Sequence, residues 1–73
     1  MQDSKGALQE HLQKDGGDAP TYEIISQDGP PHNRTFEAAV YRCGIELARG
    51  TGRTKKQAEQ AAALAALEKL PKE

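Results

Sequence analysis

The chain has 73 residues, of which 36% are hydrophobic and 29% charged, and ten basic against eleven acidic side chains give a net charge of −1. This length supports one hydrophobic core and excludes a second domain. No apolar run approaches the roughly 20 residues that span a bilayer, and no leader peptide is expected after Met1. Cys43 has no second cysteine to pair with, and His11 and His32 alone do not make a metal cage. We therefore expect a cytoplasmic domain that binds neither metal nor membrane.

Residues 4–14 are predicted to form a short amphipathic helix, capped by Asp3 or Ser4 and ended by Gly16. Its predicted apolar positions recur at helical spacing: Ala7, Leu8, His11 and Leu12. Gln9 and Gln13 lie one turn apart on the polar face, and Lys5 extends the same row. The glutamines suit ribose hydroxyls and base edges, and equally an ordinary solvated face.

Three β-rich segments follow: 21–26, 35–42 and 45–49. Phe36, Ala38 and Val40 alternate as a strand with one buried face requires. Cys43 and Gly44 supply the tight turn between the second and third strands. The connection between the first two strands, residues 27–34, is longer than a minimal hairpin. Its Pro31, His32 and Arg34 make either a stiff polar probe or an ordinary proline loop.

The last predicted element is a helix over residues 54–70, opened by a capping box of Thr54 and Gln57 and ended before Pro71. Its inward face is mostly alanine, with the positions Ala58, Ala62, Ala63, Ala66, Leu67 and Leu70. Small side chains let a helix approach a sheet closely. The sequence thus predicts an α+β fold of order α-β-β-β-α, in which two helices pack on one face of a three-stranded antiparallel sheet.

Basic residues gather at the start of this last helix. Arg53, Lys55 and Lys56 occupy a stretch without acids, although a helix N-terminus favours acidic side chains. The arrangement suits a docked anion, because backbone N–H groups, the helix dipole and two ammonium groups converge there. The alternative is that two solvated lysines tolerate a small penalty, about 0.3 to 1 kcal/mol.

Enzymatic interpretations find little support. Cys43 lies in the predicted turn and has no evident base, so it more simply shapes the bend. The acids are dispersed over different elements, unlike the clustered carboxylates of a metal-dependent nuclease. Gly50 and Gly52 resemble part of a phosphate loop, but the Gly-x-x-x-x-Gly-Lys-Ser/Thr pattern is absent.

Taken together, residues 4–70 resemble the double-stranded RNA-binding domain. The motifs that carry the resemblance are Leu8-Gln9-Glu10, Pro20-Thr21-Tyr22, Gly29-Pro30-Pro31-His32, Gly50-Thr51-Gly52 and Thr54-Lys55-Lys56-Gln57-Ala58. The run from Gly50 to Ala62 is most similar to the C-terminal domain of bacterial ribonuclease III. Residues 1–3 and 71–73 are expected to be tails, the first of them disordered.

The resemblance implies a three-point grip on an A-form duplex of about 16 base pairs, read mainly by shape and 2′-hydroxyls. The implied RNA-binding residues are Gln9, Glu10, Gln13, Pro31, His32, Arg34, Arg53, Thr54, Lys55 and Lys56. Two positions depart from the family pattern: Glu59 stands where a basic residue is common, and Ala48 where glycine is common. The first is expected to weaken the phosphate clamp.

We therefore expect a non-catalytic module that binds double-stranded RNA for a separate nuclease domain. The resemblance implies that Mg²⁺, homodimerisation, endonucleolytic hydrolysis and the processing of RNA, including ribosomal RNA, belong to the parent enzyme. The isolated domain is expected to be a monomer without a cofactor. The rival hypothesis is a protein-interaction module of the same fold that has lost RNA binding.

Overall fold

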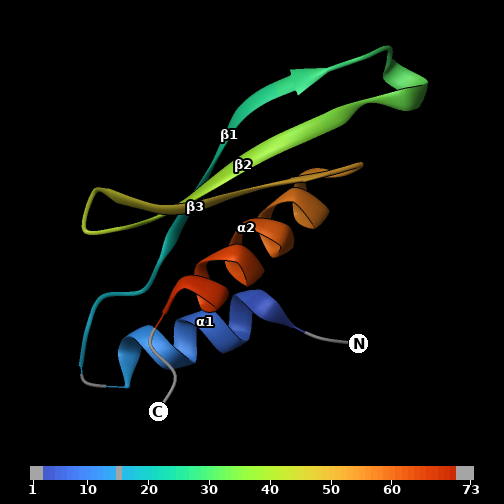
Figure 1. Ribbon diagram of the computed structural model, residues 1–73. Helices are drawn as coiled ribbons and strands as arrows, with labels where there is room; N and C mark the ends of the chain where they lie inside the picture. Colours follow the sequence, from blue (N-terminus) through green and yellow to red (C-terminus); the bar gives the residue numbers. More distant parts are fainter. Residues whose placement is uncertain (1–2, 15, 71–73) are drawn as a thin grey trace.

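The computed structural model describes residues 3–14 and 16–70. Its elements, in chain order, are helix α1 (Ser4–Gln13), strand β1 (Thr21–Asp28), a 3₁₀ turn η1 (Pro31–Asn33), strands β2 (Thr35–Arg42) and β3 (Ile45–Gly52), and helix α2 (Lys55–Lys69). Figure 1 shows both helices on the same side of the sheet. The predicted α-β-β-β-α fold is confirmed.

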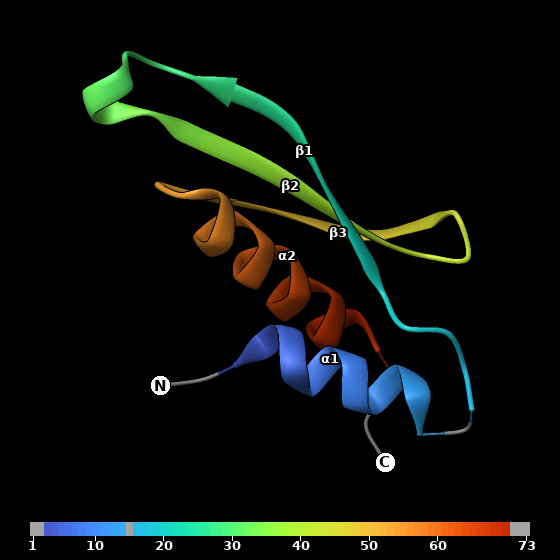
Figure 2. The same cartoon turned by 180° about the vertical axis from the view of Figure 1, so that it is seen from behind.

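Helix α1 begins at Asp3, whose carboxylate accepts a hydrogen bond of 3.1 Å from the Gly6 N–H. Its inward row is Ser4, Leu8 and Leu12, spaced four residues apart, and all three are buried. The prediction that Ala7 and His11 share this face is wrong, because both are exposed. The reason is that α1 packs on α2, which lies between α1 and the sheet (Figure 2), so that only the row facing α2 is covered. The predicted tails fall on residues 1–2 and 71–73, which lie outside the described residues, and on Asp3, the N-cap.

The sheet has the order β1-β2-β3 with both pairs antiparallel. Strands β1 and β3 run further than predicted, to Asp28 and Gly52. The added residues pair with the start of β2, where Phe36 lies between Gln27 and Gly52. Long strands therefore carry the β1–β2 loop well away from the β2–β3 hairpin at the opposite end of the sheet (Figure 1).

Helix α2 lies directly against β2 and β3 through its alanine face. Ala58, Ala62, Ala63 and Ala66 are buried there, while Leu67 and Leu70 are half-buried at its margin. Gly50 makes the close approach possible, because a Cβ at that position would lie 2.2 Å from the Ala62 backbone nitrogen. The short distance between sheet and helix fixes where the N-terminus of α2 emerges.

Helix α1 forms an outer layer on α2 and also reaches the sheet through side chains. Arg42 of β2 donates a hydrogen bond of 3.3 Å to the Leu12 carbonyl, and Lys5 lies over the Tyr22 ring. In the part of the chain that the structure describes, no helix is long and apolar enough to cross a membrane. The position of α1 is thus set mainly by α2.

Candidate nucleic-acid interface

Three surface elements lie along one edge of the molecule: η1 in the β1–β2 loop, the N-terminus of α2, and the N-terminal part of α1. Both views show this order along the edge (Figures 1 and 2). The Cα trace extends 42 Å in its longest dimension and only 16 Å in its shortest. The molecule is therefore elongated and thin, and the three elements follow one another along one of its edges (Figure 1).

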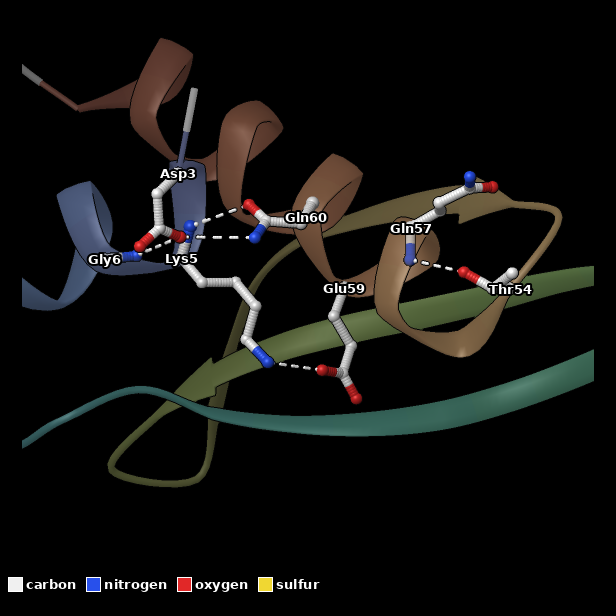
Figure 3. A network of polar contacts seen from close by, with 7 residues as sticks. All are labelled: Asp3, Lys5, Gly6, Thr54, Gln57, Glu59 and Gln60. Atoms are coloured by element: carbon white, nitrogen blue, oxygen red, sulfur yellow. Dashed lines mark hydrogen bonds and ion pairs between the residues drawn. The ribbon is translucent and has the colours of Figure 1, made fainter. Parts of the chain in front are cut away.

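The N-terminus of α2 is held by its capping residues. The Thr54 hydroxyl accepts a hydrogen bond of 3.0 Å from the Gln57 N–H (Figure 3). The Gln57 side chain in turn accepts from the Arg53 N–H at 3.0 Å, one residue before the position of an ordinary capping box. The predicted cap is confirmed, and it leaves part of the first turn's N–H groups directed outward.

Lys55 and Lys56 occupy the exposed first turn of α2, which carries no acidic residue. Within the described residues, neither ammonium group forms a hydrogen bond or an ion pair. The helix dipole adds partial positive charge at this end. The first turn of α2 thus combines two exposed cations with backbone donors, which is the chemistry that binds phosphate oxygens.

Hydrogen bonds hold the β1–β2 loop where it faces α2. Gly29 adopts φ +94°, and the Asn33 N–H closes the 3₁₀ turn on the Pro30 carbonyl at 2.9 Å. Arg34 is anchored to β1 by a hydrogen bond of 3.2 Å to the Gln27 side chain. His32 is exposed at the tip of this turn.

Arg53 connects this loop to α2. Its guanidinium donates a hydrogen bond to the Asn33 side-chain oxygen. Between them lies an open depression of about 310 Å³, lined by Pro31, His32, Asn33, Arg34, Phe36 and Arg53. The sequence predicts four of these six residues as candidates and misses two, Phe36 and Asn33. The partner of Asn33 is 20 residues away in the chain.

Helix α1 presents Gln9, Glu10 and Gln13 to solvent in its C-terminal half, whereas the part of α1 that lies on the edge near the N-terminus of α2 is its first turn (Figure 1). The Gln9 amide donates to the Gln13 side-chain oxygen at 3.2 Å, which confirms that the two share one face. Lys5 does not continue this row, because its side chain turns to Glu59 of α2. The free hydrogen-bonding atoms of the two amides leave the pair able both to donate and to accept.

Cys43 lies apart from this edge, in the β2–β3 turn (Figure 1). It adopts φ 53° beside Gly44 at φ 77°, as a tight hairpin turn requires. The hydrogen bond it donates to Asp18, and the charge of that carboxylate, raise the pKa of the Cys43 thiol. A raised pKa opposes formation of the nucleophilic thiolate. Within residues 3–14 and 16–70, no group of three or more metal-ligating side chains is suited to hold a metal ion.

Comparison with known proteins gives one consistent result. The family model described as double-stranded RNA binding motif matches residues 4–70. Ribonuclease 3 of Bacillus velezensis is 49% identical over 72 residues, which cover 99% of this chain and 29% of the relative. Ribonuclease 3 of Lactococcus lactis is 54% identical over 61 residues, which cover 84% and 26%. The chain thus spans less than a third of the length of these curated relatives.

Solved structures agree on the fold. Arabidopsis HYL1 superimposes with a TM-score of 0.75 at 36% identity, over 92% of this chain and 94% of that one. Dicer from Pichia stipitis gives a TM-score of 0.76 at 20% identity, over 93% of this chain and 33% of that one, and supports the fold alone.

Proposed function

The chain belongs to the family of double-stranded RNA binding motifs, and we propose that it holds an A-form RNA duplex along the edge formed by α1, the β1–β2 loop and the N-terminus of α2. The observation that carries this proposal is that η1, the N-terminus of α2 and the start of α1 follow one another along one edge, with the α1 amides further along that helix (Figures 1 and 2). Their chemistry is complementary to RNA: amide groups for ribose hydroxyls, and ammonium groups for phosphates.

In this arrangement α1 enters one minor groove through Gln9, Glu10 and Gln13. The β1–β2 loop enters the next minor groove, with Pro31 and His32 at its tip and Arg34 behind them. Lys55 and Lys56 bind phosphates across the intervening major groove, so the footprint covers about 16 base pairs. Arg53 and Thr54 support the lysines, Thr54 by capping the helix.

Recognition depends on shape, because no element is placed to read base edges in a major groove. Contacts with 2′-hydroxyls favour RNA, and the groove spacing of B-form DNA misplaces the two minor-groove elements relative to each other. The net charge of −1 means that acids elsewhere oppose the approach of a polyanion. We therefore expect modest affinity and a strong dependence on salt.

The relatives indicate the wider setting. In an enzyme like Ribonuclease 3, this module would hold the duplex for a separate nuclease domain that supplies Mg²⁺-dependent endonucleolytic hydrolysis. Such a parent would process RNA, including ribosomal RNA, in the cytoplasm and act as a homodimer through its nuclease domain. We propose that the domain alone is monomeric and contributes substrate binding only.

Fluorescence anisotropy tests the proposed function. Labelled RNA and DNA duplexes of the same sequence, about 20 base pairs long, are titrated with the purified chain at several salt concentrations. We expect binding to RNA that weakens linearly in log salt, and much weaker binding to DNA. Absence of RNA binding even at low salt would overturn the proposal and favour the protein-interaction hypothesis.

A further inference from the structure

Lys5 belongs by sequence to the polar row of α1, yet its side chain makes two contacts away from solvent. Its ammonium nitrogen lies 2.5 Å from the Glu59 carboxylate of α2 and 4.7 Å from the centre of the Tyr22 ring. Figure 3 shows the lysine reaching from α1 towards Glu59. Lys5 and Glu59 are 54 residues apart in the chain, so this pair joins two elements that share no local connection.

A second link runs beside the first. The Lys5 N–H donates to the Gln60 side-chain oxygen at 3.1 Å, and the Gln60 amide donates to the Asp3 carboxylate at 3.2 Å (Figure 3). Gln60 therefore uses both ends of its amide to hold the first turn of α1. The same Asp3 oxygen also caps Gly6, so the cap of α1 and its attachment to α2 share one carboxylate.

The ion pair is only partly accessible to water. The side chains of Lys5 and Glu59 are 34% and 24% exposed, compared with 54% and 37% for Arg49 and Glu46, the pair on β3. Burial, and then the Glu59 and Asp3 charges, raise the pKa of Tyr22 to about 12, consistent with a carboxylate close to the ring. A pair in this setting is screened less by salt than a surface pair.

The positions of these residues matter for the interface. Glu59 and Gln60 lie one helical turn after Lys55 and Lys56, and Lys5 lies one turn before Gln9. The two links therefore connect the phosphate-binding turn of α2 directly to the groove-binding face of α1. The distance from a minor groove to the neighbouring major-groove phosphates differs between A-form and B-form duplexes, so the separation of these two elements affects which duplex fits.

We propose that Lys5 and Glu59, supported by Gln60, are positioning residues that set the spacing between the α1 amides and the α2 lysines, and thereby the preference for RNA over DNA. This inference rests on the proposed function. In this proposal Glu59 does not weaken RNA binding. Its charge is neutralised by Lys5, and the pair holds α1 in place relative to the α2 lysines.

Two simpler accounts make different predictions. If Glu59 only repels phosphates, neutralising it strengthens binding to RNA and DNA equally and leaves their ratio unchanged. If Lys5 is itself a phosphate ligand, replacing it lowers the salt dependence by about one unit of slope, because one counterion-releasing contact is lost. Positioning instead changes the RNA-to-DNA ratio and leaves the slope unchanged.

The test compares Lys5→Gln, Glu59→Gln, the double variant, and the charge swap Lys5→Glu with Glu59→Lys. Glu46→Gln, which breaks the pair with Arg49 on β3, is the matched control. Anisotropy with RNA and DNA duplexes of about 20 base pairs gives the affinity ratio and the salt slope. Circular dichroism melting ensures that each variant is measured well below its unfolding transition.

We expect each single variant to lower the RNA-to-DNA ratio by about fivefold, with no further fall in the double variant, because the two residues act as one unit. The charge swap should restore part of the ratio, and the control should match the wild type. An unchanged ratio in Glu59→Gln, with or without a lower melting temperature, would overturn the inference, and so would a swap that restores nothing. A wild-type chain with no RNA binding would instead overturn the proposed function beneath it.

Discussion

Arg53 at the start of α2 donates a hydrogen bond to the side chain of Asn33 in the β1–β2 loop. The contact joins the segment before α2 to the β1–β2 loop, as Glu59 and Lys5 join α2 to α1. The N-terminal half of α2 and the residue before its cap are therefore attached to both elements that we propose to enter the minor grooves. The spacing of the three contact points is built around this one helix.

Replacing Asn33 by alanine tests the loop attachment. Asn33 and Arg53 are both exposed, so the free energy of unfolding should change by less than about 0.5 kcal/mol. RNA affinity should fall about threefold, because the loop loses a polar contact of ordinary strength that fixes its position. Anisotropy with the RNA duplex measures this change. Wild-type affinity in Asn33→Ala would show that the loop is held adequately by the Arg34 and Pro30 contacts alone.

The double variant Lys55→Ala/Lys56→Ala tests the phosphate clamp. Two lost phosphate contacts should reduce the slope of log affinity against log salt by about two and nearly abolish binding. Circular dichroism should stay unchanged, since both side chains are exposed. Lys69→Ala, at the far end of α2, is the control, because its ammonium group contacts only the Leu47 carbonyl at 3.4 Å among the described residues. Equal losses in Lys69→Ala would contradict the assignment.

Removal of the α1 amides should affect selectivity more than affinity. In Gln9→Ala/Gln13→Ala we expect the preference for RNA over DNA to fall, because amide contacts to 2′-hydroxyls are lost while the lysines remain. His11→Ala is a suitable control on the same helix, since His11 is also exposed. Parallel anisotropy titrations with RNA and DNA measure the ratio. A ratio of RNA to DNA affinity equal to that of the wild type would contradict the proposed contact of α1 with the minor groove.

Gly50→Ala tests the close packing of α2 on β3. A Cβ there would lie 2.2 Å from the Ala62 backbone nitrogen and 2.4 Å from the Ala61 carbonyl carbon. Relief of these contacts would require the backbone of α2 to move away from β3. Overpacking of this kind costs about 1 to 3 kcal/mol of the free energy of unfolding. Urea denaturation measures the loss, with Thr51→Ala on the exposed side of β3 as the control. A stability equal to that of the control would mean that helix and sheet are further apart than described.

The Tyr22 hydroxyl should make the stability of the wild type depend on pH, and Tyr22→Phe should remove this dependence. The Tyr22 hydroxyl is buried and has no hydrogen-bond partner among the described residues, and its pKa is raised from 10.0 to about 12, mainly by burial. The native state thus keeps a proton that the unfolded chain releases, and the free energy of unfolding falls as the pH rises from about 10 to about 12. Phenylalanine removes this contribution and the unpartnered hydroxyl.

Urea denaturation at about pH 8 and about pH 11 separates the effect of the raised pKa from the effect of the buried, unpartnered hydroxyl. At the lower pH, Tyr22→Phe should be as stable as the wild type or slightly more stable. At the higher pH its advantage should grow. An advantage that stays constant between the two would show that the hydroxyl titrates normally in the folded domain.

Local patterns predicted the elements well. The alternation of Phe36, Ala38 and Val40 and the cap at Thr54 are short-range signals, and each produced the element expected. The same patterns misplaced the inward face of α1, because Ala7 and His11 are judged by periodicity alone while burial depends on which neighbour the helix meets. The ends of β1 and β3 also depended on pairing across the sheet.

In the candidate site, too, residues with a local sequence signal could be predicted, and residues that depend on distant partners could not. Lys55 and Lys56 could be found from sequence because cations at a helix N-terminus violate a local rule. Asn33 and Gln60 could not, since their partners are distant in the chain. From sequence alone, Glu59 looks like an acid that weakens phosphate binding, because its partner Lys5 is also distant in the chain. Only the folded chain brings the two charges together.

The most direct test of the account is to map the amide chemical shifts of the isotope-labelled chain while an RNA duplex of about 20 base pairs is added. We expect perturbed amides at Gln9 and Gln13 on α1, at His32 in the β1–β2 loop, and at Lys55 and Lys56 on α2. Amides on the exposed side of the sheet, such as Thr51, should keep their positions. Perturbations centred on that side of the sheet, or on the β2–β3 turn, would contradict the proposed interface.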